Sequence, residues 1–278
     1  MFKLIVKLAL IALVGYGAYF YFIDYNETVA DVPEVSYEDV NQVAEGLAES
    51  GEVMSGGVVV NGDADETSET SEVSETDETD ETSETNETIP AEFNLGVPFT
   101  SQAPSSNWDL PYQEACEEAS AYMVSEYYKG TVAGQIDPIV AETAILEVVA
   151  FEEDFLGFYL DTTVAETVSF IDMFYGLSAR AVENPTVDDI KTEIAAGRPV
   201  IVPAAGRELG NPNFTGAGPL YHMLVIKGYT EDFFITNDPG TRNGESYVYD
   251  IDVIMEAMGD WNNGDPANGA KRVIFISP

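Results

Sequence analysis

The sequence predicts one α+β domain that follows a membrane-spanning helix and an extended acidic stalk. An apolar run opens the chain, a Glu-Thr-Ser segment of one charge sign follows, and segments of helical spacing then precede apolar runs typical of strands. We therefore divide the 278 residues into a signal anchor (1–23), a juxtamembrane segment (24–61), an acidic disordered linker (62–90) and a folded domain (91–278).

The amino-terminal run is long enough to cross a bilayer. Residues 4–23 are apolar apart from Lys7, and about 20 helical residues span the roughly 30 Å hydrocarbon core. Lys3 precedes the run, whereas Asp24 and Glu27 follow it, so the positive-inside rule places the rest of the chain outside the cell membrane. The alternative is a cleaved signal peptide. Bulky aromatic residues follow the small ones, which makes a poor cleavage site and favours an uncleaved single-pass anchor.

The stalk is predicted to be a spacer with one short helix near its start. Ser36 and Asp39 form a capping-box pattern, and the apolar positions that follow have helical spacing. Residues 62–88 contain 12 acidic and no basic residues. Low hydrophobicity and unbroken like charge predict an extended, disordered linker and not a binding domain.

Composition limits what the folded domain can do. The chain has a formal charge of −39, and residues 89–278 alone hold 29 acidic and 9 basic residues. Such a field repels nucleic acid, and it either attracts cationic partners or keeps the surface soluble. One cysteine and one histidine exclude an intramolecular disulfide and a zinc site. We expect no metal and no cofactor, and the sequence leaves the oligomeric state open.

The folded domain is predicted to begin with helices and to end with strands. Helical spacing covers residues 114–129, 138–150, 163–175 and 186–196, the last of which ends at Gly197. Strand patterns follow at residues 199–205, 223–229, 233–236, 246–249 and 273–276, with a short helix at 252–258. Helices first and a mostly antiparallel sheet second are typical of an α+β domain.

Cys116 is the first candidate for chemistry. It lies at the start of the first predicted helix, where the helix dipole favours a thiolate. The alternative is a buried cysteine that packs as a small apolar residue. Glu117 and Glu118 oppose ionisation of the thiol, each by about 1 kcal/mol at about 7 Å and an effective dielectric of about 40. Because successive helical positions point apart, we expect a smaller effect.

His222 is the second candidate. It lies between a Gly/Pro/Asn-rich loop, residues 206–221, and a predicted strand, where loops often border a cleft. The alternative is a structural histidine. The hairpin that follows brings His222 within about two residues of Asn237 or Asp238. Either side chain could accept the ring N–H, and the alternative for both is a purely turn-forming role.

Gln102 completes the candidate set. A side-chain amide upstream of the nucleophile could stabilise an oxyanion together with the Cys116 backbone N–H. Without further information it is a polar loop residue.

Taken together, these motifs have a recognisable order. The segments Val-Pro-Phe-Thr-Ser-Gln (97–102), Ala-Cys-Glu-Glu-Ala-Ser (115–120), His-Met-Leu-Val-Ile-Lys-Gly-Tyr (222–229) and Asn-Asp-Pro-Gly (237–240), with Trp108 between the first two, resemble the C39-like group of papain-like bacterial peptidases, which are related to bacteriocin-leader peptidases. The resemblance covers about residues 94–278. It implies a papain-like cysteine peptidase fold with helices packed on the sheet, and no cofactor. It assigns the catalytic roles to Gln102, Cys116, His222 and Asp238.

Other features qualify the resemblance. Many members have Gly-Pro after the cysteine, where this chain has Glu117-Glu118, and the transporter and ATPase of the leader peptidases are lacking. A role in processing double-glycine leaders is therefore not implied. We expect Trp108, Tyr112 and Asn237 near the cleft, together with the loop of residues 206–221.

The sequence thus predicts a membrane-tethered, extracytoplasmic cysteine peptidase. It would hydrolyse peptide or protein substrates through a Cys-His-Asp triad and an acyl-enzyme intermediate. One alternative is a cell-wall amidase or transpeptidase that uses the same thiolate. The other is a non-catalytic surface binding module whose thiol is idle.

Overall fold

The computed structural model of the chain describes residues 32–42 and 89–278. The predicted signal anchor, most of the juxtamembrane segment and nearly all of the acidic linker lie outside these residues. Within the described part, no helix is long and apolar enough to cross a membrane.

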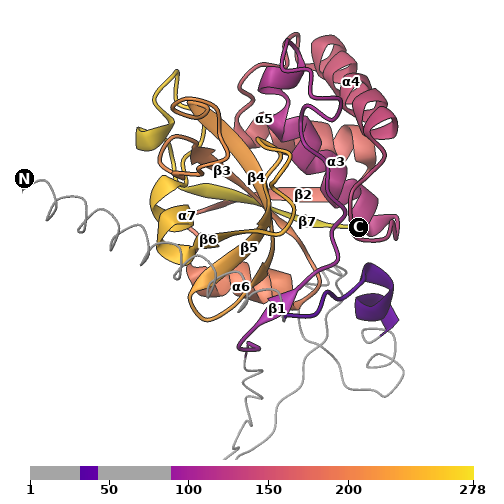
Figure 1. The fold of residues 1–278 in the computed structure, drawn as a ribbon, viewed down its shortest axis with the longest axis vertical. Coiled ribbons are helices and arrows are strands. Elements are labelled where there is room, and N and C mark those ends of the chain that lie inside the picture. Colours follow the sequence, from indigo (N-terminus) through magenta and orange to yellow (C-terminus); the bar gives the residue numbers. More distant parts are fainter. Residues whose placement is uncertain (1–31, 43–88) are drawn as a thin grey trace, which may run out of the picture. The chain divides into compact units, whose positions relative to one another are not determined.

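The core of the domain is an antiparallel sheet of seven strands (Figure 1). Six strands follow the order β2-β7-β3-β4-β5-β6, and β1 pairs with the end of β4. Their bounds are β1 Phe93–Asn94, β2 Ser178–Glu183, β3 Val200–Ala205, β4 Tyr221–Tyr229, β5 Phe233–Asn237, β6 Tyr247–Asp250 and β7 Arg272–Ser277. Strand β4 is buried along its whole length, so the central strand carries His222 into the interior.

The helices cover this sheet. Figure 1 shows α3, α4 and α5 gathered on one side of the sheet, with α6 and α7 on the other. Their bounds are α3 Cys116–Tyr128, α4 Pro138–Phe155, α5 Val164–Phe170, α6 Val187–Ala195 and α7 Ile251–Ala257, with 3-10 turns at Tyr112–Glu114 and Pro266–Asn268. Helix α3 packs on β4, and α4 packs on α3. Residues 116–125 of α3 are all buried as a result.

The predicted α+β arrangement is confirmed, with three differences, of which the first is the unpredicted two-residue strand β1. The predicted helix over residues 163–175 is divided, because α5 ends at Phe170 and a π-helical turn, Ile171–Tyr175, continues to Gly176 in the left-handed region at φ 68°. The third difference is β2, an unpredicted edge strand that pairs only with β7. Its residues are mostly exposed, so it lacks the apolar pattern that predicts a buried strand.

The short helix predicted near the start of the stalk is present at residues 37–42. Ser36 Oγ accepts from the Asp39 N–H and donates to the Asp39 carboxylate. The segment packs on the folded domain, because Val35 forms a β-bridge with Leu95. A ring cluster of Tyr37, Tyr127 and Tyr128 adds edge-to-face contacts. Residues 32–41 therefore belong to the same compact unit as residues 89–278.

An ion pair fastens this segment to β4. Lys227 is fully buried at a β-bulge, and its ammonium donates to the Glu34 carboxylate, to Asn94 Oδ1 (3.0 Å) and to the Leu95 carbonyl (3.1 Å). Burial lowers the pKa of Lys227, and the Glu34 charge opposes that shift. A buried ammonium is tolerated only when it is paired and hydrogen-bonded, so Glu34 supports the fold from outside the main domain sequence.

We predict that Glu34→Gln lowers the free energy of unfolding by about 1–2 kcal/mol. This is less than the loss of a fully buried partner would cost, because Glu34 is partly exposed. Urea unfolding measures it, and Glu38→Gln, which removes an exposed charge from the same segment, is the control. Equal stability of the two variants would show that the ion pair does not hold the segment.

Candidate active site

Cys116 is the first residue of α3, as predicted. No side chain caps this helix end. The thiol is 5% exposed and lies close to β4, where Ser120 Oγ of the next turn donates to the Met223 carbonyl. The packing of α3 on β4 therefore holds the sulfur beside the start of the strand that carries His222.

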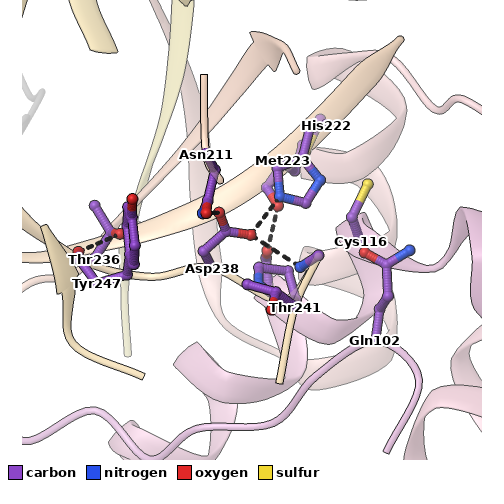
Figure 2. Close-up of polar contacts among 12 residues, drawn as sticks. Gln102, Cys116, Asn211, His222, Met223, Thr236, Asp238, Thr241 and Tyr247 are labelled. Carbon is purple, nitrogen blue, oxygen red and sulfur yellow. Dashed lines mark hydrogen bonds and ion pairs between the residues drawn. The ribbon is translucent and has the colours of Figure 1, made fainter. Parts of the chain in front are cut away.

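His222 and Asp238 form a buried hydrogen-bonded pair. His222 Nε2 lies 2.7 Å from Asp238 Oδ1, and both side chains are at most 1% exposed. Figure 2 shows the ring between the Asp238 carboxylate and the Cys116 sulfur, with its second nitrogen on the side of the sulfur. The hairpin of β4 and β5 creates this arrangement, because Val225 pairs with Asn237 and Asp238 follows the strand end.

Gln102 lies beside Cys116 (Figure 2). Its backbone N–H donates to the Pro239 carbonyl (2.9 Å), which ties this loop to the turn after Asp238. Its side-chain Nε2 donates to the Tyr112 and Gln113 carbonyls at 2.9 and 2.8 Å, and its Oε1 is buried without a hydrogen-bond partner. The amide hydrogens therefore face main-chain carbonyls at the start of α3.

The order Gln, Cys, His, Asp around one sheet end is matched by a sequence family. Residues 94–265 match the profile of the Peptidase_C39 like family, which covers more than half of the chain. The chain belongs to the C39-like peptidase family. No curated protein matches the chain in sequence.

Two solved structures are similar to this C39-like chain at low sequence identity. A crystal structure of a C39-like peptidase from Bacillus anthracis is 14% identical with a TM-score of 0.46, and the match covers 67% of this chain and 98% of the other. The peptidase domain of Streptococcus ComA, a bifunctional ABC transporter of a quorum-sensing pathway, is 15% identical with a TM-score of 0.31 over 60% of this chain and 93% of the other. Family membership rests on the sequence profile.

In the C39-like domain a cleft of about 830 Å³ is lined by Tyr221 and Gly240, which are close in sequence to His222 and Asp238; Cys116, His222 and Asp238 themselves do not line it. Trp108 and the loop of residues 206–221 line it, together with Gln102. Carboxylates and guanidinium groups both face the cleft, from Glu114, Asp161, Arg207 and Arg242. The described residues contain no group of three or more His, Cys, Asp or Glu side chains that could hold a metal ion.

Two residues expected near the cleft are not among those that line it. Tyr112 is buried in a small apolar cluster, and its hydroxyl donates to Glu142 at 2.7 Å. Asn237 is fully buried, and its amide donates to the Val97 and Pro98 carbonyls. The Tyr112 carbonyl bonds to Gln102, and Asn237 holds the loop that leads to Gln102.

Three residues of the site were not predicted. Tyr249 of β6 donates its hydroxyl to Asp238 Oδ2 at 2.6 Å, and Asn211 donates its amide to the same oxygen at 3.0 Å. Phe214 packs edge-on against the His222 ring, with centroids 5.4 Å apart. Burial alone would raise the pKa of Asp238, but the His222 charge and the hydrogen bonds from His222, Tyr249 and the Gly240 N–H outweigh it and lower the pKa.

The environment of Cys116 differs from the expectation. The thiol donates to Glu117 Oε2 at 3.0 Å, and both side chains are buried. The adjacent carboxylate thus turns towards the sulfur instead of away from it. Burial, followed by the Glu117 charge and hydrogen bond, raises the pKa of the Cys116 thiol well above its ordinary value.

We predict that Gly240→Ala lowers peptide hydrolysis about 100-fold, since small misplacements of reacting groups have costs of that order. A Cβ at Gly240 would lie 2.8 Å from both His222 Cε1 and Phe214 Cε1, so the imidazole must move. Initial rates on a cleaved peptide measure it. Gly96→Ala is the control, because its Cβ would make only ordinary contacts at 3.5 Å or more. Equal rates for both variants would contradict the prediction.

Proposed function

We propose that this C39-like chain is a cysteine peptidase that hydrolyses peptide bonds with Cys116 as nucleophile, His222 as general base and Asp238 as the residue that orients the imidazole. One observation carries the proposal: the buried His222–Asp238 hydrogen bond presents the free ring nitrogen to the sulfur at the start of α3. Acyl transfer requires a nucleophile, a base beside it and a third group that orients the base.

The reaction proceeds in two halves. The Cys116 proton moves to His222, and the sulfur attacks the carbonyl carbon of the scissile bond. The resulting imidazolium then gives its proton to the leaving amine, and the C–N bond breaks to leave a thioester on Cys116. A water molecule, deprotonated by His222, attacks the thioester and regenerates the thiol. The orienting bond from Asp238 keeps the ring in the correct tautomer throughout.

The oxyanion of the reaction needs hydrogen-bond donors that can be released from other acceptors. The Cys116 backbone N–H lies at the open end of α3, where no side chain caps it. Gln102 is the second donor in this proposal. Because its Nε2 donates to the Tyr112 and Gln113 carbonyls, one of these bonds must exchange for the oxyanion as the substrate binds.

The cleft supports a peptide as the substrate. Its volume of about 830 Å³ suits an extended chain with several side chains. Because acidic and basic groups both line it, polar side chains of the substrate would find partners along its length.

The proposal includes the location of the enzyme. The apolar residues 1–23 serve as a single-pass membrane anchor, and the acidic residues 62–88 serve as the spacer that holds the domain on the outer side. The support is the sequence pattern alone. Protease protection in intact cells tests it, because an extracytoplasmic domain is digested from outside whereas a cytoplasmic one is not.

The single cysteine makes the chemistry testable with one reagent. Since Cys116 is the only thiol in the chain, an alkylating reagent can act on sulfur at no other position. Hydrolysis of a peptide library should fall in proportion to the alkylated fraction, as measured by intact mass. Full activity in completely alkylated protein would refute the cysteine mechanism.

A further inference from the structure

Glu117 contacts the proposed nucleophile, although the three-residue mechanism gives it no role. Its Oε2 accepts the Cys116 thiol hydrogen bond at 3.0 Å. Glu117 is 1% exposed and Cys116 is 5% exposed, so little water competes for this bond. A carboxyl group in contact with the reacting sulfur must change the protonation of that sulfur.

The surroundings of Glu117 are acidic. Titratable groups interact with it from the elements around it: Cys116 and Glu118 on α3, Glu152 on α4, Asp161 before α5, and Tyr221 on β4. His222, also on β4, lies beside Cys116 (Figure 2). Within residues 32–42 and 89–278 no lysine or arginine forms an ion pair with Glu117. Burial, together with the Glu118 charge, raises the pKa of Glu117 well above its ordinary range. A buried carboxyl without a cation is most stable when it holds a proton.

We propose that Glu117 is a further catalytic residue, which shares one proton with Cys116 and restricts the reactive thiolate to pH values below the Glu117 ionisation. This inference rests on the proposed function for its catalytic meaning. In the reactive form the Glu117 carboxylic acid donates to the Cys116 thiolate, and His222 holds the thiol proton. Loss of one proton to solvent gives the second form: Glu117 is a carboxylate, the sulfur keeps its proton and donates it to Oε2, and His222 is neutral.

The two forms differ in nucleophilicity, because the thiolate and not the thiol attacks carbon. As pH rises through the Glu117 ionisation, the reactive form is lost, so the rate falls. An ordinary thiol behaves in the opposite way, since its reactivity rises with pH up to its own ionisation. The sign of the pH dependence therefore separates the proposal from an isolated cysteine.

The test is the alkylation rate of Cys116 in the full chain with iodoacetamide, from acidic to alkaline pH, followed by intact mass. The wild-type rate should pass through a maximum and then fall as pH rises through the Glu117 ionisation. In Glu117→Gln the amide still donates to sulfur but no charge develops. We therefore expect the fall to disappear and the rate at pH values above the wild-type maximum to rise about tenfold or more, given a like charge at 3.0 Å.

The matched control is Glu118→Gln. It makes the same change at the next position of α3, where the carboxyl is close to Glu152 and does not contact the sulfur. We expect its rate profile to keep the maximum and the fall, displaced to lower pH because the Glu118 charge no longer raises the pKa of Glu117. If Glu117→Gln does not fold, Glu117→Asp replaces it: the charge is kept but withdrawn from the sulfur by one methylene, and the fall with pH should become smaller.

The proposal is overturned if wild type and Glu117→Gln have the same pH dependence, or if Glu117→Gln reacts more slowly than wild type at pH values above the wild-type maximum. The latter result would make the carboxylate a base for the thiol. Alkylation does not require peptide hydrolysis, so the two proposals fail separately. Hydrolysis that depends on Cys116, with unchanged alkylation in Glu117→Gln, would remove only the role of Glu117. Altered alkylation without hydrolysis of any peptide would remove only the peptidase.

Discussion

Cys116→Ala should lower peptide hydrolysis by about 10⁴-fold or more while the domain stays folded. Removal of the nucleophile from a catalytic unit leaves only the effects of binding and of the oxyanion donors. The alanine removes a small buried side chain at the end of α3, so we expect a loss of stability of about 1 kcal/mol. Initial rates and thermal unfolding of the same preparation measure both quantities.

Ser125→Ala is the control for this variant. It removes one buried heavy atom from the same helix, where Ser125 Oγ donates to the Tyr122 carbonyl and does not line the cleft. Its activity should equal that of the wild type. Hydrolysis by Cys116→Ala within tenfold of the Ser125→Ala rate would mean that the thiol is idle.

Asp238→Ala should lower both activity and stability. The carboxylate is fully buried and accepts from His222 Nε2, the Gly240 N–H, Asn211 Nδ2 and the Tyr249 hydroxyl. Removing it leaves these groups unpaired, which costs about 3–5 kcal/mol for a buried charged network. Hydrolysis should fall about 10²–10⁴-fold, because the His222 ring loses its orienting bond.

The pH dependence of this loss has a definite sign. The pKa of Asp238 lies below its ordinary value in the folded protein. The ionised carboxylate therefore contributes stability that is complete above the ordinary pKa of about 4 and is lost as pH falls through the lower, folded value. The difference in unfolding free energy between wild type and Asp238→Ala should shrink in strongly acidic urea titrations. A constant difference would show that the charge of Asp238 does not matter.

The conservative variant separates orientation from charge. Asp238→Asn keeps the size of the side chain, and its one acceptor oxygen can still accept the hydrogen bonds from Tyr249 and Asn211. Its NH2 group then faces His222 and the Gly240 N–H, which both bond to the other carboxylate oxygen in the wild type. We expect the variant to recover part of the stability lost in Asp238→Ala but to remain slow, since an amide does not stabilise the imidazolium. Wild-type rates in Asp238→Asn would contradict the role given to the carboxylate.

Local patterns predicted the framework of the site because local physics determines it. Helical spacing placed Cys116 at the amino terminus of α3, and the β4–β5 hairpin limited the partner of His222 to two adjacent residues. Hairpin geometry alone did not decide whether Asn237 or Asp238 is the partner of His222. In the structure Asp238 bonds to His222, whereas Asn237 turns to the Val97 and Pro98 carbonyls.

Contacts between distant segments were not predictable from these patterns. Tyr249 and Asn211 reach Asp238 from β6 and from the loop after β3, and no spacing in the sequence relates them to it. The Glu117 side chain was expected to point away from Cys116 because of its place on the helix. Glu117 lies in the first turn of α3 and is buried there, and its carboxyl turns back to the Cys116 sulfur at 3.0 Å.

The packing of residues 32–41 on the folded domain is a second contact between distant segments that was not predictable. Their sequence predicted a short capped helix within a stalk, and that helix is present. The role of this helix depends on Lys227, a charged residue within the otherwise apolar pattern of the buried strand β4. Only the bulge in β4 and the approach of Glu34 show why a buried lysine is tolerated there.

The central claim is that Cys116 carries the acyl group during peptide hydrolysis, and trapping that group tests it most directly. The full chain would be mixed with an activated acyl ester at acidic pH, quenched in acid and analysed by peptide mass mapping. We predict a thioester on Cys116 that forms in the wild type, decays by hydrolysis and forms far more slowly in His222→Ala. Turnover of the ester with no acyl group on Cys116 at any time would contradict the mechanism.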